Sequence, residues 1–223
     1  MRSLHLSRLF LAALLLAGCD GDLRMAEECY RLGDYARSRR LFEAEIDRDP
    51  VSFRARYGYA VVLQELSLRK KGLGEDGAED WMETVKAYEI CSKLGEVGSF
   101  SKNYSLALFH LANKLYAREK HEAALEYLNR ARKLEPKNKY VLNLAGVVEY
   151  SLGRYRDAQE TFEYLLAVDP AFVSAYLNLG NVLWEAGQED AALVTWKQAL
   201  SLSPHNPAVV GRIESALKQI SGS

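Results

Sequence analysis

The chain has 223 residues, of which 29 are lysine or arginine and 30 are aspartate or glutamate, so its formal net charge is −1. That balance excludes the strongly positive surface by which nucleic-acid-binding proteins attract phosphate, and no stripe of lysine and arginine stands out against it. We therefore expect no nucleic-acid partner.

The N-terminal residues have the organisation of a secretory leader. Arg2 and Arg8 precede an unbroken apolar run from Leu9 to Ala17, and small residues follow it. This run is far shorter than the roughly 20 residues that a transmembrane helix needs. We therefore predict a cleaved signal peptide over residues 1–18, with a short core helix as the other interpretation.

The Leu-Ala-Gly-Cys ending of this segment, at 16–19, resembles the bacterial lipoprotein box. The resemblance implies that the Cys19 thiol carries a diacylglycerol and that its freed amine takes a further acyl chain such as palmitate. Two or three acyl chains form a stable anchor where one is marginal. The expected location is the bacterial cell envelope, facing the periplasm, with inner and outer membrane both open. An ordinary leader with a chance cysteine is the alternative.

Most of the remaining chain repeats with a period of 34 residues. Pro136, Pro170 and Pro204 lie 34 residues apart, and the positions ahead of each proline recur in step. Each period predicts a first helix, a turn and a second helix, which the proline separates from the next unit. The recurring positions are Leu111-Ala112, Ala145-Gly146 and Leu179-Gly180; Gly153 and Gly187; Ala124, Ala158 and Ala192; and Leu128, Phe162 and Trp196.

This pattern resembles the tetratricopeptide repeat family. The resemblance implies an all-α fold, a right-handed α-solenoid of helix-turn-helix units, in which stacking buries faces that no unit can bury alone. The register predicts five units, at 19–52, 53–98, 105–138, 139–172 and 173–206, and then a capping helix and tail at 207–223.

The second unit diverges from the others. Between Pro50 and Pro136 lie 86 residues, which is two periods plus 18. We place an insert at 67–80, between helices at 53–66 and 81–94, and a loose joint at 95–104. In the capping helix we expect an apolar side facing the array and a polar outer side. The apolar side consists of Val210, Ile213, Ala216, Leu217 and Ile220, and the outer side of Arg212, Glu214, Lys218 and Gln219.

A search for catalytic or metal-binding motifs finds only weak matches. Residues 72–77 fit the dinucleotide-binding pattern G-x-G-x-x-G, but they follow a predicted helix instead of a strand, so we interpret them as a flexible loop. His121-Glu122 begins like a zinc-protease motif, yet Leu125 stands where the second histidine belongs. We predict no catalytic residue, no metal and no cofactor. Cys29 and Cys91 are either small core residues or a disulfide.

A binding groove is predicted on the first helices, which line the concave side of such arrays. Spacing of i, i+4 and i+7 selects a face on which Tyr116, Tyr150 and Trp184 recur at the 34-residue period. Such a stripe is either a groove or part of the core, and both interpretations stand. The predicted groove residues are Tyr57, Phe109, Asn113, Tyr116, Asn143, Tyr150, Leu177, Asn181 and Trp184, with Val61, Gln64 and Val147 on the same face.

Aromatic rings beside asparagine amides suit a peptide or helix of another protein. The alternative ligand is peptidoglycan or another glycan that stacks on the rings. Some family members grip a C-terminal carboxylate with lysine and arginine, but Phe109, Ser174 and Leu177 stand at those positions here. Lipoproteins of similar architecture assemble pili and other envelope complexes. We therefore expect a membrane-anchored, non-catalytic scaffold for protein–protein interaction.

Overall fold

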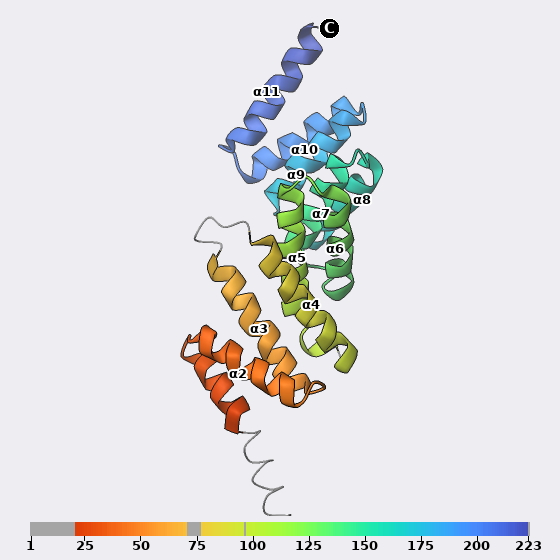
Figure 1. The fold of residues 1–223 in the computed structure, drawn as a ribbon. Coiled ribbons are helices and arrows are strands. Elements are labelled where there is room, and N and C mark those ends of the chain that lie inside the picture. Colours follow the sequence, from red (N-terminus) through yellow and green to blue (C-terminus); the bar gives the residue numbers. More distant parts are fainter. Residues whose placement is uncertain (1–20, 71–76, 96, 223) are drawn as a thin grey trace, which may run out of the picture. The chain divides into compact units, whose positions relative to one another are not determined.

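A computed structural model describes residues 21–70, 77–95 and 97–222 (Figure 1). The predicted signal peptide, Cys19 and residues 71–76 of the glycine motif lie outside the described residues. Within the described part every regular element is helical, which confirms the all-α prediction. The helices span residues 21–31, then α2 Tyr35–Arg48, α3 Phe53–Lys70, α4 Ala78–Leu94, the short 3-10 helix η2 Val97–Ser99, α5 Ser101–Ala117, α6 His121–Leu134, α7 Lys139–Ser151, α8 Tyr155–Val168, α9 Val173–Glu185, α10 Glu189–Leu202 and α11 Pro207–Gly222.

The turns within the units follow the predicted period. Gly33, Gly153 and Gly187 have φ between +72° and +79°, the left-handed region that favours glycine. Glu119 occupies the same point of its own unit with φ of +58°. Since Glu119, Gly153 and Gly187 are spaced by the period of 34, the turn geometry recurs even where glycine is replaced.

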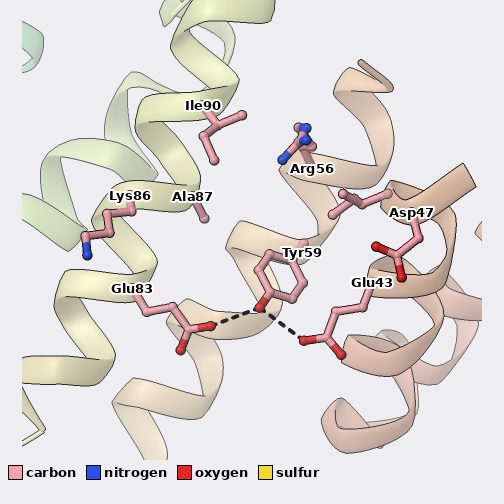
Figure 2. A pocket seen from close by; sticks show the side chains of 9 residues that line it. Glu43, Asp47, Arg56, Tyr59, Glu83, Lys86, Ala87 and Ile90 are labelled. Atoms are coloured by element: carbon pink, nitrogen blue, oxygen red, sulfur yellow. Dashed lines mark hydrogen bonds between the residues drawn. The ribbon is translucent and has the colours of Figure 1, made fainter. Parts of the chain in front are cut away.

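The chain divides into two compact units, which are larger than the 34-residue repeats. The first unit ends at Ala107 and the second unit begins at Leu108. In the first unit α2 and α4 both pack on α3, and Tyr59 of α3 lies between Glu43 of α2 and Glu83 of α4 (Figure 2). Its core includes Phe42, whose ring lies where a side chain at Gly58 would clash.

In the second unit α7 packs on α8, and α9 packs on both α8 and α10. The close approach of these helices depends on glycine. A Cβ on Gly146 would lie 2.6 Å from the Phe162 ring, and one on Gly180 would lie 2.2 Å from Trp196 Nε1. Phe162 and Trp196 are fully buried and fill the space that the two glycines leave.

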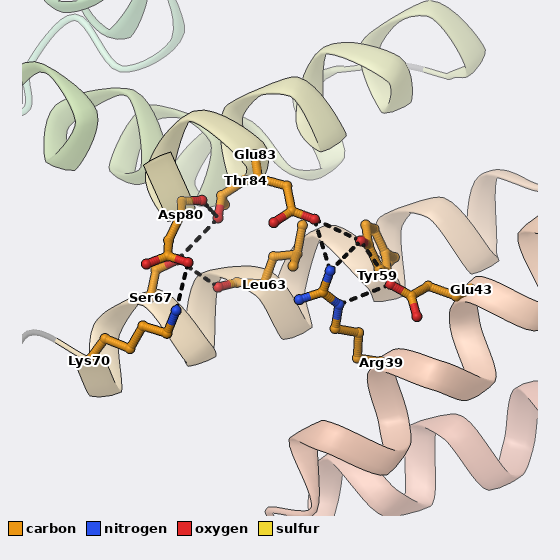
Figure 3. Close-up of polar contacts among 9 residues, drawn as sticks. All are labelled: Arg39, Glu43, Tyr59, Leu63, Ser67, Lys70, Asp80, Glu83 and Thr84. Atoms are coloured by element: carbon orange, nitrogen blue, oxygen red, sulfur yellow. Dashed lines mark hydrogen bonds and ion pairs between the residues drawn. The ribbon is translucent and has the colours of Figure 1, made fainter. Parts of the chain in front are cut away.

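The predicted insert at 67–80 is helical at both of its ends, over 67–70 and 78–80, which corrects the expected helix ends. α3 continues to Lys70 and α4 begins at Ala78, so only residues 71–77 separate them. Side chains join the two extensions (Figure 3): Ser67 Oγ lies 3.3 Å from Thr84 Oγ1, and Lys70 Nζ lies 2.8 Å from Asp80 Oδ1. These cross-helix contacts stabilise turns that the apolar pattern does not predict.

The predicted loose joint at 95–104 is also more ordered than expected. Phe100 and Tyr104 are buried, and their ring centroids lie 6.0 and 5.7 Å from that of Tyr88. α5 accordingly begins at Ser101, four residues ahead of residue 105, where the third repeat was predicted to start. An aromatic cluster stands here in place of the closing proline of the regular units.

The C-terminal helix is rotated relative to the prediction. Val209 and Ala216 are buried and Ile213 packs partly against the core, whereas Leu217 and Ile220 are 51% and 41% exposed. Asn206 fixes the start of α11, because its Oδ1 accepts hydrogen bonds from the backbone N–H groups of residues 208 and 209. The predicted apolar side is therefore wrong for Leu217 and Ile220.

Among the described residues, no helix combines the length and the apolar character that crossing a membrane requires.

Candidate functional site

The second unit contains a cavity of about 190 Å³ on the face of its first helices. Tyr116 comes from α5, Val147, Tyr150 and Ser151 from α7, Phe162 from α8, and Asn178 and Asn181 from α9. We call this cavity the α7–α9 pocket. The buried Phe162 ring contributes an apolar wall, and the tyrosines and asparagines supply the polar ones.

Hydrogen bonds fix the polar side chains of the α7–α9 pocket. The Tyr116 and Ser151 hydroxyls lie 3.2 Å apart, and Ser151 Oγ donates to the Val147 carbonyl at 3.0 Å. Asn178 Nδ2 donates to Asn143 Oδ1 at 3.2 Å. The pocket is thus a defined arrangement of side chains, because neighbouring helices hold each polar group.

Arg212, which was predicted on the polar outer side of the capping helix, lies beside this pocket. Arg212 Nε of α11 donates to Asn181 Oδ1 at 2.8 Å, and its Nη2 lies 3.9 Å from Glu185 Oε1. The outward placement of Arg212 was wrong, because α11 turns its 209, 213 and 216 side toward the core. Burial, and then the Glu185 carboxylate, raises the pKa of Tyr150.

The structure brings together part of the predicted groove. Tyr116, Tyr150 and Asn181 line the α7–α9 pocket with Val147, and Asn143 touches it through Asn178. Asn113 of α5 is exposed and lies outside this lining.

Trp184, the third of the aromatic residues that recur at the 34-residue period, lies outside the α7–α9 pocket. The ring centroid of Trp184 is 5.7 Å from that of buried Trp196, whose Nε1 donates to the Leu177 carbonyl at 3.1 Å. Trp184 and Leu177 are partly buried against the hydrophobic core of the second unit. For these two residues the core interpretation describes their contacts better than the groove interpretation.

The remaining predicted positions separate as well. Phe109 is half-buried with its ring 5.4 Å from that of His110. Tyr57 of the first unit lines a different cavity, together with Val61, and accepts a hydrogen bond from Asn103 at 3.0 Å. Gln64 is buried, and its Oε1 accepts from the Tyr88 hydroxyl at 3.0 Å, so its placement on the groove face was wrong.

Sequence reasoning missed Ser151, Phe162, Asn178 and Arg212. Asn178 lies one helical turn before Asn181, and Arg212 follows Asn178 by the same 34-residue period that aligned the tyrosines. Helical spacing from Asn181 was the available signal for Asn178, and the period then leads from Asn178 to Arg212. Phe162 was counted only as a core residue, although its ring also borders the pocket.

The described residues hold no group of three or more histidine, cysteine or acidic side chains that could bind a metal ion. Cys29 and Cys91 are both buried and free. Burial raises the pKa of the Cys91 thiol to about 11, so this thiol is not poised for nucleophilic chemistry.

Solved structures share the fold. The crystal structure of YrrB, described as a TPR protein with an unusual peptide-binding site, aligns at a TM-score of 0.62 and 19% identity over 86% of this chain and 90% of its own. The crystal structure of MamA aligns at a TM-score of 0.57 and 20% identity over 80% of this chain and 94% of its own. At these identities the likeness concerns the fold, and it agrees with the predicted α-solenoid.

The alignments with sequence relatives span a smaller part of those proteins. BBSome complex member BBS4 of Xenopus tropicalis is 30% identical over 66% of this chain, which corresponds to 26% of that protein. A TPR repeat-containing protein of Rhizobium etli is 23% identical over 61% of this chain and 66% of its own length. Residues 23–68, 109–155 and 143–207 match the Tetratricopeptide repeat family, which is more than half of the chain. The chain therefore belongs to the tetratricopeptide repeat family.

Proposed function

We propose that this chain is a non-catalytic scaffold that binds a peptide or helix of a partner protein at the α7–α9 pocket. A volume of about 190 Å³ falls below the roughly 300–1,000 Å³ of small-molecule sites. The pocket therefore suits one side chain of a larger ligand. Its tyrosines give contact area at a low entropic cost.

The single observation that carries the proposal is the orientation of two amides. Asn181 Oδ1 accepts from Arg212, which leaves the Nδ2 hydrogens of Asn181 as donors. Asn178 Nδ2 donates to Asn143, which leaves Oδ1 of Asn178 as an acceptor. One donor and one acceptor beside an apolar pocket match the C=O and N–H of a peptide backbone.

The relatives agree with a peptide ligand. YrrB has a peptide-binding site by its description, and the first TPR of RPAP3, which aligns at a TM-score of 0.50 and 16% identity, was solved with the HSP90 peptide SRMEEVD. Those ligands belong to those proteins. We carry over to this chain only the class of ligand, a peptide segment.

The experiment is crosslinking in intact cells, with a Tyr116→Ala/Tyr150→Ala variant compared with the natural chain. A protein partner should be recovered with the natural chain and lost with the variant. Tyr140→Ala is the matched control, since Tyr140 is 59% exposed and lies outside the pocket lining. Trp184 is left unchanged because it lies outside the pocket lining. Tyr150 packs partly against the core, so the double variant must keep the circular dichroism of the natural chain for the loss to count. Recovery of the same partner by the double variant would refute the pocket assignment.

A glycan ligand would give another result. Tyrosine rings also stack on sugars, so the same double variant should then be released from insoluble peptidoglycan, while the crosslinked proteins stay unchanged. That outcome would replace the peptide by the glycan as ligand.

We also propose that Cys19 anchors the protein in the bacterial envelope, facing the periplasm, and that the scaffold serves assembly of a pilus or another envelope complex. The apolar run ahead of Cys19 supports the anchor. Cys19→Ser should leave an uncleaved precursor without acyl label in cells fed labelled palmitate. Normal cleavage of that variant would contradict the lipoprotein proposal and leave the α7–α9 pocket unaffected.

A further inference from the structure

The first unit has a second cavity, of about 260 Å³, between its second helices. Glu43 and Ile46 of α2 form one wall, and Glu83, Ala87 and Ile90 of α4 form the other, with Tyr59 of α3 between them (Figure 2). We call this cavity the α2–α4 slot. The α7–α9 pocket is lined mainly by first helices of its unit, whereas the walls of the slot are second helices.

One end of the slot is closed by a polar cluster (Figure 3). Arg39 of α2 donates to Glu43 Oε1 at 2.9 Å and to Glu83 Oε1 at 3.1 Å. The Tyr59 hydroxyl lies 3.1 Å from the same oxygen of Glu43 and 2.9 Å from that of Glu83. Burial, and then the hydrogen bond to Glu83, raises the pKa of Tyr59, so the phenol stays protonated.

This cluster carries excess negative charge. Two carboxylates share one guanidinium, and both bond through Oε1, while neither Oε2 has a hydrogen bond among the described residues. The side chains of Glu43 and Glu83 are 41% and 44% exposed, so a cation from outside can reach them. Half-exposed carboxylates with a free oxygen are suited to a charge-assisted hydrogen bond.

Beyond the cluster the slot is apolar. Ile46 and Ala87 line it, and Ile90 is 39% exposed at its other end. Glu83, Ala87 and Ile90 recur at i, i+4 and i+7, which spans about 10 Å of helix at about 1.5 Å per residue. The slot thus presents an acidic site and an apolar site along two turns. Asp47, Arg56 and Lys86 line it as well, with one negative and two positive charges.

One corresponding place in the second unit, between α6 and α8, has a basic lining instead. Counted back from the closing prolines Pro50 and Pro136, Ile46 and Asp47 correspond to Arg132 and Lys133. Those two cations line a cavity of their own with Tyr164. The lining therefore varies from repeat to repeat, since the same count from Pro170 gives Glu163 and Leu166 where the first unit has Glu43 and Ile46.

We propose that the α2–α4 slot is a docking surface for a helical segment of a partner protein that carries an apolar residue and, one turn away, a lysine or arginine. The apolar residue occupies the space beside Ile46 and Ala87, and the cation bonds the free oxygens of Glu43 and Glu83. A helix in a groove between two helices presents such residues at i and i+4.

The test is selection of helical peptides from a randomised display library on the full-length chain. The selected peptides should carry an apolar residue with lysine or arginine four positions away. Their dissociation constants, measured by fluorescence anisotropy, should weaken at least tenfold on Ile90→Lys and on Glu83→Gln. Val194→Lys is the matched control, because Val194 is 56% exposed on α10, is not among the residues that line the slot, and its replacement adds the same charge as Ile90→Lys.

Both variants should retain the helical circular dichroism of the natural chain, since Ile90 and Glu83 are partly exposed. Selection of acidic peptides, binding that Ile90→Lys leaves unchanged, or no enrichment at all would each overturn the proposal. The variants of the α7–α9 pocket are in the other unit, so failure here and failure of the proposed function are separate results.

Discussion

Gly180→Ala tests the idea that the second unit depends on close helix approach. The new Cβ would lie 2.2 Å from Trp196 Nε1 and 2.4 Å from its Cδ1, so the buried indole must move. Overpacking of this kind costs about 1–3 kcal/mol, and losing the bond from Nε1 to the Leu177 carbonyl adds about 1 kcal/mol. Alanine regains about 1 kcal/mol of helix propensity. The expected net loss is about 1–3 kcal/mol.

The assay is urea unfolding followed by circular dichroism and tryptophan fluorescence. Gly211→Ala is the matched control, because a Cβ there meets nothing within 4 Å, and it should stabilise α11 by about 0.5–1 kcal/mol. Trp196→Leu leaves a cavity, but it should cost less in the Gly180→Ala background than in the natural chain, since it also removes the ring that the Cβ meets. Equal stability of Gly180→Ala and the natural chain would refute the close-approach argument.

Three further predictions concern single positions. Burial raises the pKa of Glu149, so its contribution to stability is present below the unfolded pKa and is lost as pH rises through the folded pKa. Thermal melts should therefore show Glu149→Gln gaining on the natural chain as pH rises through that window; a constant difference would contradict it. With Cys29→Ser, a chain from residue 21 should react with a thiol reagent at Cys91 only on unfolding, and rapid native labelling would exclude the buried, protonated thiol. Gly33→Ala should cost about 1–2 kcal/mol in urea unfolding, because φ there is +79°; no loss would mean that the turn adapts.

The repeated parts of the fold were predictable because the same residue types recur at intervals of 34 residues, so each repeat supports the interpretation of the others. Glu119 lies one period before Gly153, as Gly153 lies one period before Gly187. The period therefore predicts a left-handed turn at Glu119, although glutamate itself does not favour positive φ. The ends of α3 and α4 were not predictable in this way. They depend on the contacts of Ser67 with Thr84 and of Lys70 with Asp80, which join residues that no apolar pattern links.

The candidate site shows a similar division. The period selected Tyr116 and Tyr150 correctly as neighbours, since equivalent positions of stacked helices share a face. It failed for Trp184, because the repeat that contains Trp184 has Trp196 where the preceding repeat has Phe162. Trp184 packs against this larger ring, and the two ring centroids lie 5.7 Å apart. A period states which face a residue occupies, and the size of its neighbours decides what that residue contacts.

Arg212 shows which of two signals deserves more weight at the end of an array. The predicted buried side of α11 included Leu217 and Ile220, which put Arg212 on the outer side. In the structure Val209, Ile213 and Ala216 pack against the core instead. The 34-residue step from Asn178 places Arg212 correctly beside Asn181. The last helix of an array packs against a neighbour on one side only, so part of its apolar surface stays exposed. Its row of apolar residues therefore does not show which side is buried. The register inherited from the preceding unit does not depend on that surface, and it is therefore the better guide to the phase of a terminal helix.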